Sequence, residues 1–251
     1  MSDPPHEQPE RRLALLLDHL SALGHDLRNP IASLLLGIQR LERRTADAPE
    51  RTAALLARLE RSVRGIDRLV ETLLDLGRLE SGRLELERQG EPVEVVAAQA
   101  VAAVAGLATE GRRSVQVAVP PGLAAPPWDG ARAAKAVAHL LAPALEFTPL
   151  GGTVWLSASA HRGGVRFTVE DGGPPLAAGE AEALFGGTPF NGDPHTRRRG
   201  HGPFLYVARR LAEAHGGAAE ARAGARGGAE LSAWFPGAAG GERPAGGAGG
   251  A

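Results

Sequence analysis

Apolar residues recur at alternating intervals of three and four along two segments in the first third of the chain. The first segment runs from Leu13 to Leu41 and the second from Leu55 to Leu79. This spacing is typical of amphipathic helices whose apolar stripe packs against a partner helix. Between the segments, Asp47 is placed to cap the second helix and Pro49 to lie in its first turn. We therefore predict an antiparallel helical hairpin. Because each stripe is broad enough for more than one neighbour, we also predict that two copies form a dimeric four-helix bundle.

The pattern changes at Gln89–Pro92, where a Gly/Pro-containing stretch ends the helical spacing. Beyond it we predict helices at 93–108, 129–145 and 204–215, and strands at 114–119, 153–159, 165–169 and 230–235. A turn is expected at 161–164. Helices interspersed with strands in this order predict an α/β sandwich, in which a mixed sheet packs on helices. The chain as a whole is predicted to belong to the α+β class.

The same changes of pattern divide the chain into four regions. Residues 1–11 are rich in proline and charge and are expected to be disordered. The helical hairpin is assigned to residues 12–88 and the sandwich to residues 89–237. Residues 238–251 form a Gly/Ala-rich tail that is expected to be flexible.

Composition narrows the function classes. Hydrophobic residues make up 43% of the 251 residues, which is enough for a core, and the net charge of -1 gives no overall attraction to nucleic acid or to an acidic membrane. With no cysteine, disulfides and thiolate metal sites are excluded. The polar N-terminus has no apolar signal segment, and no uninterrupted apolar run approaches the roughly 18 residues that span a membrane. These features predict a cytoplasmic protein without nucleic-acid or membrane partners.

One histidine interrupts the first helical segment in an unusual setting. His25 is followed by Asp26, Asn29 and Pro30, and at about 100° per residue it lies opposite the apolar stripe, facing water. Imidazole, with a pKa of about 6.5, is largely neutral at pH 7 and can act as a nucleophile, and Asp26 could hold the ring in its reactive tautomer. A lone exposed His-Asp pair is usually only a solvated surface feature. However, a proline inside a helix costs about 3 kcal/mol, which folding alone does not explain.

Four motifs, in this order, resemble those of the bacterial sensor histidine kinases of two-component signalling. His25–Pro30 resembles the family's phosphoacceptor box. In the second half, His139–Gly152 resembles the asparagine-box region, and Val169–Leu176 and Gly200–Leu205 resemble two glycine boxes. The resemblance covers nearly the whole chain between the predicted tails. It implies a dimerisation and phosphotransfer hairpin followed by an ATP-binding domain.

The resemblance also implies roles for individual residues. His25 would carry a phosphoryl group, and Asp26 and Asn29 would orient a water that hydrolyses the partner's aspartyl phosphate. That partner is a response-regulator receiver domain, which carries its own Mg²⁺ site. In the second domain, the implied nucleotide contacts are Asp171, which would meet the adenine, and Gly173, Gly200 and Gly202.

This sequence departs from the family at positions that matter for ATP chemistry. Where the family has Asn-x-x-x-Asn, with the Mg²⁺ ligand, this chain has His139 and Pro143, and the lysine position a turn later holds Glu146. Family glycines are replaced by Pro175 and Phe204. Proline offers no side-chain oxygen to a hard cation, and a glutamate would repel phosphate. We therefore expect no metal site and no cofactor on this chain, and nucleotide contacts at Asp171, Gly173, Gly200 and Gly202 only if nucleotide is still bound.

The main hypothesis from the sequence is a homodimeric histidine phosphotransfer protein that exchanges phosphoryl groups between His25 and a receiver aspartate without ATP-dependent autophosphorylation. An upstream histidine kinase would then be a further partner. Dephosphorylation of the receiver is an additional activity that this hypothesis allows. One alternative is an active kinase that phosphorylates His25 with ATP and Mg²⁺. Another is a non-enzymatic scaffold. Ala32 and Leu36, on the face of His25, are equally consistent with receiver docking and with dimer packing.

Overall fold

The computed structural model describes residues 27, 30–39, 41, 49–80, 84–176, 181, 184–185 and 202–237. The chain divides into two compact units, one formed chiefly by residues up to Leu84 and the other by residues from Glu85 onward. The first unit is helical and the second contains the sheet. Each unit is described separately below. The predicted cap Asp47 lies outside the described residues.

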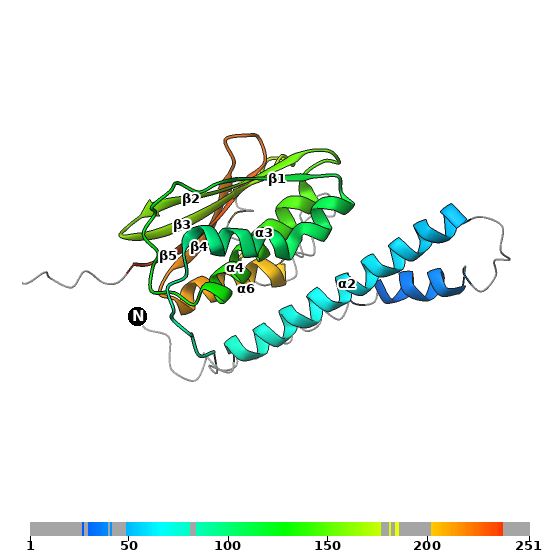
Figure 1. Cartoon of the computed structure of the whole chain (residues 1–251), viewed down its shortest axis with the longest axis horizontal. Helices are drawn as coiled ribbons and strands as arrows, with labels where there is room; N and C mark the ends of the chain where they lie inside the picture. Colours follow the sequence, from blue (N-terminus) through cyan, green and yellow to red (C-terminus); the bar gives the residue numbers. More distant parts are fainter. Residues whose placement is uncertain are drawn as a thin grey trace, which may run out of the picture. The chain divides into compact units, whose positions relative to one another are not determined.

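The helical unit contains a helix at Pro30–Gln39 and the long helix α2 (Pro49–Glu80). The second predicted helix is thus confirmed, with Pro49 as its first residue. The two helices lie side by side as a hairpin (Figure 1), and Gly37 marks their close approach. A Cβ atom at Gly37 would lie 3.2 Å from Leu59 Cγ and 3.6 Å from Leu55 Cδ1. Glycine therefore lets the two backbones come together at this point.

The second unit follows the predicted order of elements with small shifts at their ends. Its helices are α3 (Val93–Glu110), α4 (Gly130–Phe147) and α6 (Gly202–Ala214). Its strands are β1 (Ser114–Ala118), β2 (Thr153–His161), β3 (Gly164–Glu170), β4 (Ala218–Ala223) and β5 (Ala229–Phe235). All the strands and helices predicted for this half are present, and β4 is an additional strand.

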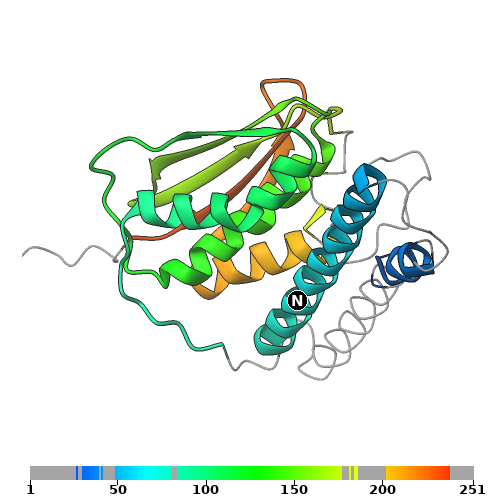
Figure 2. The ribbon, with the colours of Figure 1, turned by 45° about the vertical axis from the view of Figure 1, so that its right-hand side comes forward.

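The strands form one five-stranded sheet in the order β1-β2-β3-β5-β4. β1 runs parallel to β2, because α4 carries the chain back between them, and the other pairs are antiparallel. The sheet is therefore mixed, as predicted. Helices α3, α4 and α6 all cover the same face of it (Figures 1 and 2). This places the unit in the two-layer α/β architecture expected from the sequence.

The strand missed by the sequence analysis is β4. Its sequence, AAEARA, contains four alanines and no β-branched residue, so it lacks the local signal of a strand. It forms because its backbone pairs in register with β5, from Ala218 opposite Trp234 to Ala223 opposite Ala229. Tertiary pairing here overrides a weak local preference.

Trp128 is the anchor of the core between the sheet and the helices. Its ring is 1% exposed, stacks on Phe167 at 5.9 Å and meets the edge of Phe235 at 5.5 Å. Its indole N–H donates to the Glu91 carbonyl at 2.8 Å, which ties the segment before α3 to the segment before α4. The side chain thus satisfies its one polar group while it fills the centre of the sandwich.

A buried histidine fixes the start of α4. Asp129 caps this helix by accepting the N–H of Arg132 at 3.0 Å. The Asp129 N–H itself donates to His215 Nε2 at 3.2 Å, and Nδ1 of the same ring lies 2.7 Å from the Leu211 carbonyl. These partners require the proton on Nδ1. His215 therefore joins the end of α6 to the beginning of α4.

Among the described residues, α3 is the one helix whose length and composition would allow it to cross a membrane. In the structure it forms a layer of the sandwich beside α4 (Figure 1). One side of the helix is buried, at positions Val93, Val96, Ala97, Ala100 and Val104. Core helices of globular domains meet the same length criterion, and the packing of α3 is of that kind.

Candidate functional site

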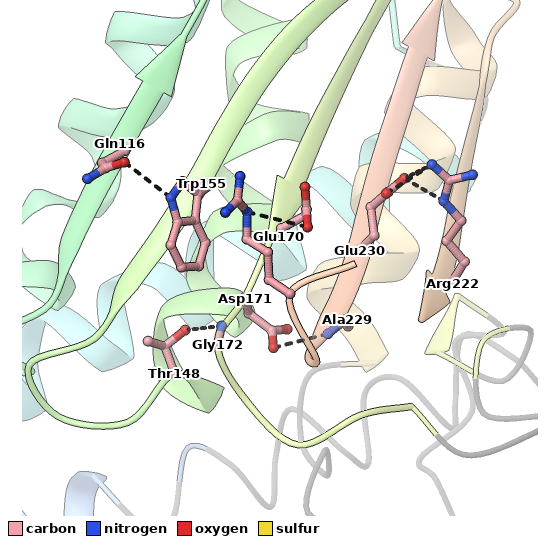
Figure 3. A network of polar contacts seen from close by, with 10 residues as sticks. Gln116, Thr148, Trp155, Glu170, Asp171, Gly172, Arg222, Ala229 and Glu230 are labelled. Atoms are coloured by element: carbon pink, nitrogen blue, oxygen red, sulfur yellow. Dashed lines mark hydrogen bonds and ion pairs between the residues drawn. The ribbon is translucent and has the colours of Figure 1, made fainter. Parts of the chain in front are cut away.

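Asp171 lies immediately after β3 and is held in a fixed orientation. Its side chain is 1% exposed, and Oδ1 accepts the backbone N–H groups of Gly173 at 2.8 Å and Ala229 at 3.1 Å. Its own N–H donates to the Ala229 carbonyl at 3.0 Å. Figure 3 shows the carboxylate between the loop after β3 and the start of β5. The fold therefore positions this carboxylate through a strand that is distant in the sequence.

Two glycines make room around Asp171. A Cβ atom at Gly173 would lie 2.9 Å from Asp171 Oδ1 and 2.9 Å from the Phe147 carbonyl oxygen, closer than real Cβ contacts. A Cβ atom at Gly228, in the β4–β5 turn, would collide with the Asp171 backbone and carboxylate. Both positions therefore require glycine for the carboxylate to keep its place. Gly173 was predicted from the sequence, whereas Gly228 was not.

Thr148 links the end of α4 to the same loop. Its hydroxyl donates to the Ala144 carbonyl at 2.8 Å and accepts the Gly172 N–H at 3.2 Å. The side chain is buried and is drawn beside Gly172 in Figure 3. Thr148 therefore joins the end of α4 to the Asp171 loop through two hydrogen bonds. Its only sequence signal was its place within the asparagine-box region, and the sequence analysis assigned it no role.

A polar cluster on the outer face of the sheet steadies the strands that carry this loop. Glu170 and Glu230 face each other across β3 and β5, where two unmatched carboxylates would repel. Arg226 Nε lies 3.7 Å from Glu170 Oε2, and Arg222 donates two hydrogen bonds to Glu230 at 2.7 and 2.9 Å. The Arg226 guanidinium also lies 4.5 Å from the ring centre of Trp155. These contacts connect the β4–β5 turn to β2 and β3 (Figure 3).

Pro143 lies inside α4, and the helix continues past it to Phe147. Proline has no backbone N–H, so the carbonyl of His139, four residues earlier, cannot receive its usual helical hydrogen bond. The Pro143 side chain is buried, while Glu146 in the next turn is exposed. Neither residue type can act as the neutral oxygen ligand or the phosphate-binding cation that the family's pattern implies at these positions.

His139 is buried against α6. Its side chain is 8% exposed, and its ring centre lies 5.7 Å from that of Phe204 in the first turn of α6. Burial, and secondarily the nearby charge of Lys135, lowers the pKa of His139 from 6.5 to about 3. Nε2 has no hydrogen-bond partner within the described part of the chain. His139 is therefore a neutral ring packed on an aromatic neighbour.

The remaining predicted site residues are only partly placed. Gly202 begins α6 and Pro175 is exposed in the loop after β3. His25, Asp26, Asn29 and Gly200 lie outside the described residues. The structure thus brings together Asp171, Gly173 and the end of α4, and it leaves the predicted phosphoacceptor histidine as a prediction.

Two family models match the chain in the order that its motifs predict. The model described as "His Kinase A (phospho-acceptor) domain" matches residues 15–82, which contain His25. The model described as "Histidine kinase-, DNA gyrase B-, and HSP90-like ATPase" matches residues 128–239, which contain Asp171. The chain belongs to the sensor histidine kinases of two-component signalling. The resemblance drawn from the sequence motifs is confirmed.

Individual histidine kinases are similar over most of this chain. Sensor protein KdpD of Mycobacterium tuberculosis is 34% identical over 203 residues, or 79% of this chain and 23% of that protein. Histidine protein kinase DivJ of Caulobacter vibrioides is 27% identical over 202 residues, or 79% of this chain and 33% of that protein. This chain therefore spans only about a quarter to a third of the length of these two relatives.

Solved histidine kinase structures share the fold. ShkA, solved in complex with AMPPNP, is 27% identical with a TM-score of 0.54, and the match covers 91% of this chain and 46% of that one. ThkA, solved in complex with response regulator protein TrrA, is 18% identical with a TM-score of 0.65, and the match covers 94% of this chain and 68% of that one. The second comparison bears on the fold alone. Both support the predicted sequence of helices followed by a sheet packed on helices.

The prediction that this histidine kinase has lost ATP-dependent phosphorylation finds no support in these comparisons, because the ATPase-like model matches its second domain. Asp171 is a fixed carboxylate that can accept hydrogen bonds, and Gly173 and Gly228 let it keep its place. The residues at the family's Mg²⁺ position do not fit the metal. Pro143 has no donor atom, the neutral His139 is not the oxygen ligand that Mg²⁺ prefers, and the described residues contain no group of three or more potential metal ligands.

Acidification is expected to destabilise the second domain of this histidine kinase through His139. Its pKa is about 3 in the folded chain but near 6.5 once unfolded, so only the unfolded state gains a proton as the pH falls below 6.5. Stability is therefore lost progressively between pH 6.5 and pH 3, at about 1.4 kcal/mol per pH unit. Denaturant unfolding at pH 6.5 and pH 5 should show that His139→Leu loses about 2 kcal/mol less than the wild type.

His215, whose pKa is also lowered by burial, is present in both the wild type and His139→Leu. Its contribution to the pH dependence of stability therefore cancels in this comparison. Equal losses of stability in the wild type and His139→Leu would contradict the prediction. They would mean that the folded chain accommodates a charged His139.

Proposed function

We propose that this histidine kinase phosphorylates His25 with ATP and passes the phosphoryl group to a receiver aspartate of a response regulator. The observation that carries the proposal is the presence in one chain of a phosphoacceptor-domain match at residues 15–82 and an ATPase-like match at residues 128–239. KdpD and DivJ, similar over 79% of the chain, are named as a sensor protein and a histidine protein kinase. The AMPPNP complex of ShkA lends support to nucleotide binding by the shared fold.

In this proposal Asp171 and Gly173 hold the adenine side of the nucleotide, with Gly200 and Gly202 as further contacts. His25 supplies a neutral ring nitrogen as the nucleophile, and Asp26 orients the ring through a hydrogen bond to its other nitrogen. ATP, when bound, supplies the γ-phosphoryl group, whose bond to the bridging oxygen breaks as the bond to His25 forms. His25 then gives the phosphoryl group to the receiver's carboxylate and returns to neutral imidazole. Asn29, with Asp26, would orient a water that attacks the receiver's aspartyl phosphate, which releases inorganic phosphate and restores the receiver's carboxylate.

A homodimer and a receiver domain are the proposed protein partners. Large apolar side chains are exposed on both described helices of the hairpin: Ile31, Leu35, Leu36, Ile38, Leu56, Val63, Val70 and Leu74 are 40–57% exposed. A second copy would cover such stripes by forming a four-helix bundle. The complex of ThkA with TrrA supports a response regulator as the other partner.

A second candidate function is phosphotransfer without ATP, in which His25 is loaded from a phosphorylated receiver. It is favoured by one specific feature of the second domain, the absence of a metal ligand at Pro143 and His139. The receiver brings its own acidic Mg²⁺ site in this family, so such a transfer needs nothing from α4. The two candidates differ in the source of the phosphoryl group.

The deciding experiment is incubation of the full chain with γ-labelled ATP and Mg²⁺, followed by detection of acid-labile, base-stable phosphohistidine. We expect label on the wild type and on His19→Gln, a control histidine from the same predicted helix, and none on His25→Gln. Because Pro143 and Glu146 are unfavourable for phosphate chemistry, the label should accumulate slowly, over minutes to hours rather than seconds.

A parallel reaction with a phosphorylated receiver separates the second candidate. Label that comes only from the receiver, and still requires His25, would replace the ATP-dependent proposal with the relay. Absence of label from both donors in a folded, dimeric sample would contradict both candidates and leave a scaffold role.

A further inference from the structure

We propose that the Asp171 site binds adenine nucleotides without a Mg²⁺ ligand at the Pro143 position of α4, so that affinity for ATP is the same with and without the metal. This inference rests on the proposed nucleotide site, but it concerns recognition rather than phosphoryl transfer. It follows from a difference in chemistry between two parts of the same site. One part holds the fixed carboxylate of Asp171, and the other part, at Pro143 and His139 of α4, offers no oxygen ligand from those two side chains.

The metal side consists of one face of α4. Pro143 brings no polar atom, and its missing N–H also removes a helical hydrogen bond from the His139 carbonyl. The His139 ring is turned into the protein, where it packs on Phe204 at 5.7 Å between ring centres. Mg²⁺ demands oxygen ligands at about 2.1 Å in octahedral geometry. A buried imidazole against a phenyl ring does not offer this.

Phe204 also changes the space for the phosphates. It lies in the first turn of α6, where a helix N-terminus could otherwise present backbone N–H groups to an anion. Its ring meets His139 instead, so α4 and α6 contact each other through two side chains at this place. The exposed Glu146, one turn beyond Pro143, adds a negative charge to the same end of α4. Neither feature favours a tightly held triphosphate.

The base side has none of these changes. Asp171 keeps both backbone hydrogen bonds, Gly173 and Gly228 keep the space that the carboxylate needs, and Thr148 keeps the loop joined to α4. A hydrogen bond that this carboxylate accepts from an exocyclic amine involves no phosphate and no metal. Adenosine, AMP and ADP, which share the base and carry less charge, should therefore bind about as well as ATP.

The test is isothermal titration of the full chain with ATP, ADP and AMP, each in buffer with Mg²⁺ and in buffer with EDTA. We expect the dissociation constants in the two buffers to agree within about threefold for every nucleotide, and to differ by less than about tenfold among nucleotides. Asp171→Asn, which keeps an acceptor for Gly173 and Ala229, should weaken all three by about tenfold or more. Far-UV circular dichroism checks that the variant is folded.

The matched variant Pro143→Asn returns an amide oxygen to α4 and should make ATP binding metal-dependent, with at least about tenfold tighter binding in Mg²⁺ than in EDTA. Wild-type ATP binding that weakens more than about tenfold in EDTA would overturn the inference. So would failure of all three nucleotides to bind in either buffer. Metal-independent binding without any label on His25 would support the inference while contradicting the proposed kinase activity.

Discussion

The double substitution Pro143→Asn with Glu146→Lys is expected to raise the rate at which Mg-ATP labels His25 by about 100-fold. A single well-placed group that stabilises developing charge is typically worth about 10²–10³ in rate. The wild-type chain has a proline where such a group would lie on α4, and an exposed carboxylate one turn later. Glu146 is exposed, so solvent and salt screen its repulsion of phosphate, and reversing the sign at position 146 adds only a smaller part of the effect.

The measurement is the initial rate of phosphohistidine formation at saturating Mg-ATP, compared across the wild type, each single variant and the double variant. Pro143→Ala serves as the control, because it restores the helical N–H without adding a ligand. If Pro143→Ala raises the rate as much as Pro143→Asn, helix geometry rather than metal ligation limits the reaction. An unchanged rate in a folded double variant would contradict the prediction.

Trp128→Ala is expected to destabilise the second domain by about 3–5 kcal/mol, which is the usual cost of truncating a fully buried aromatic side chain. The substitution removes a ring that contacts both Phe167 and Phe235 in the centre of the sandwich. It also leaves the Glu91 carbonyl without its indole donor. Typical domain stabilities are about 5–15 kcal/mol, so much of the available stability would be lost. Urea unfolding followed by circular dichroism measures the change.

Trp128→Phe is the matched control for this prediction. It keeps most of the buried ring but loses the hydrogen bond to Glu91, so it should cost about 1–3 kcal/mol, less than the alanine variant. A loss below about 1 kcal/mol for Trp128→Ala would mean that the sandwich closes around the gap and that Trp128 does not anchor the core.

The helices and most strands could be predicted because their signals are local. The spacing of leucines that predicted the second helix depends only on which face of that helix is apolar, and α2 begins at the predicted Pro49. Alternation of apolar residues likewise located β2, β3 and β5 to within two residues at each end. β4 escaped prediction because its alanines carry no such preference and its strand conformation comes from pairing with β5.

The candidate site was only partly predictable for the same reason. Asp171 and Gly173 were found through their motif, yet the interaction that orients the carboxylate comes from Ala229, 58 residues away in the sequence. Thr148, Arg226 and Gly228 support the loop only through contacts between elements. No local pattern of residues predicts such contacts.

By itself, the sequence determined the order of the elements apart from β4, the position of the motif that resembles the phosphoacceptor box and the family to which the chain belongs, because periodicity and motif spacing are properties of neighbouring residues. It also showed that Pro143 and Glu146 replace residues of the family's pattern. Only the tertiary structure decided which side chains pack around these replaced residues of α4. Packing of α4 against α6 buries His139 against Phe204, while pairing of β3 with β5 keeps Asp171 in position. The two halves of the site thus differ because they are held by different long-range contacts.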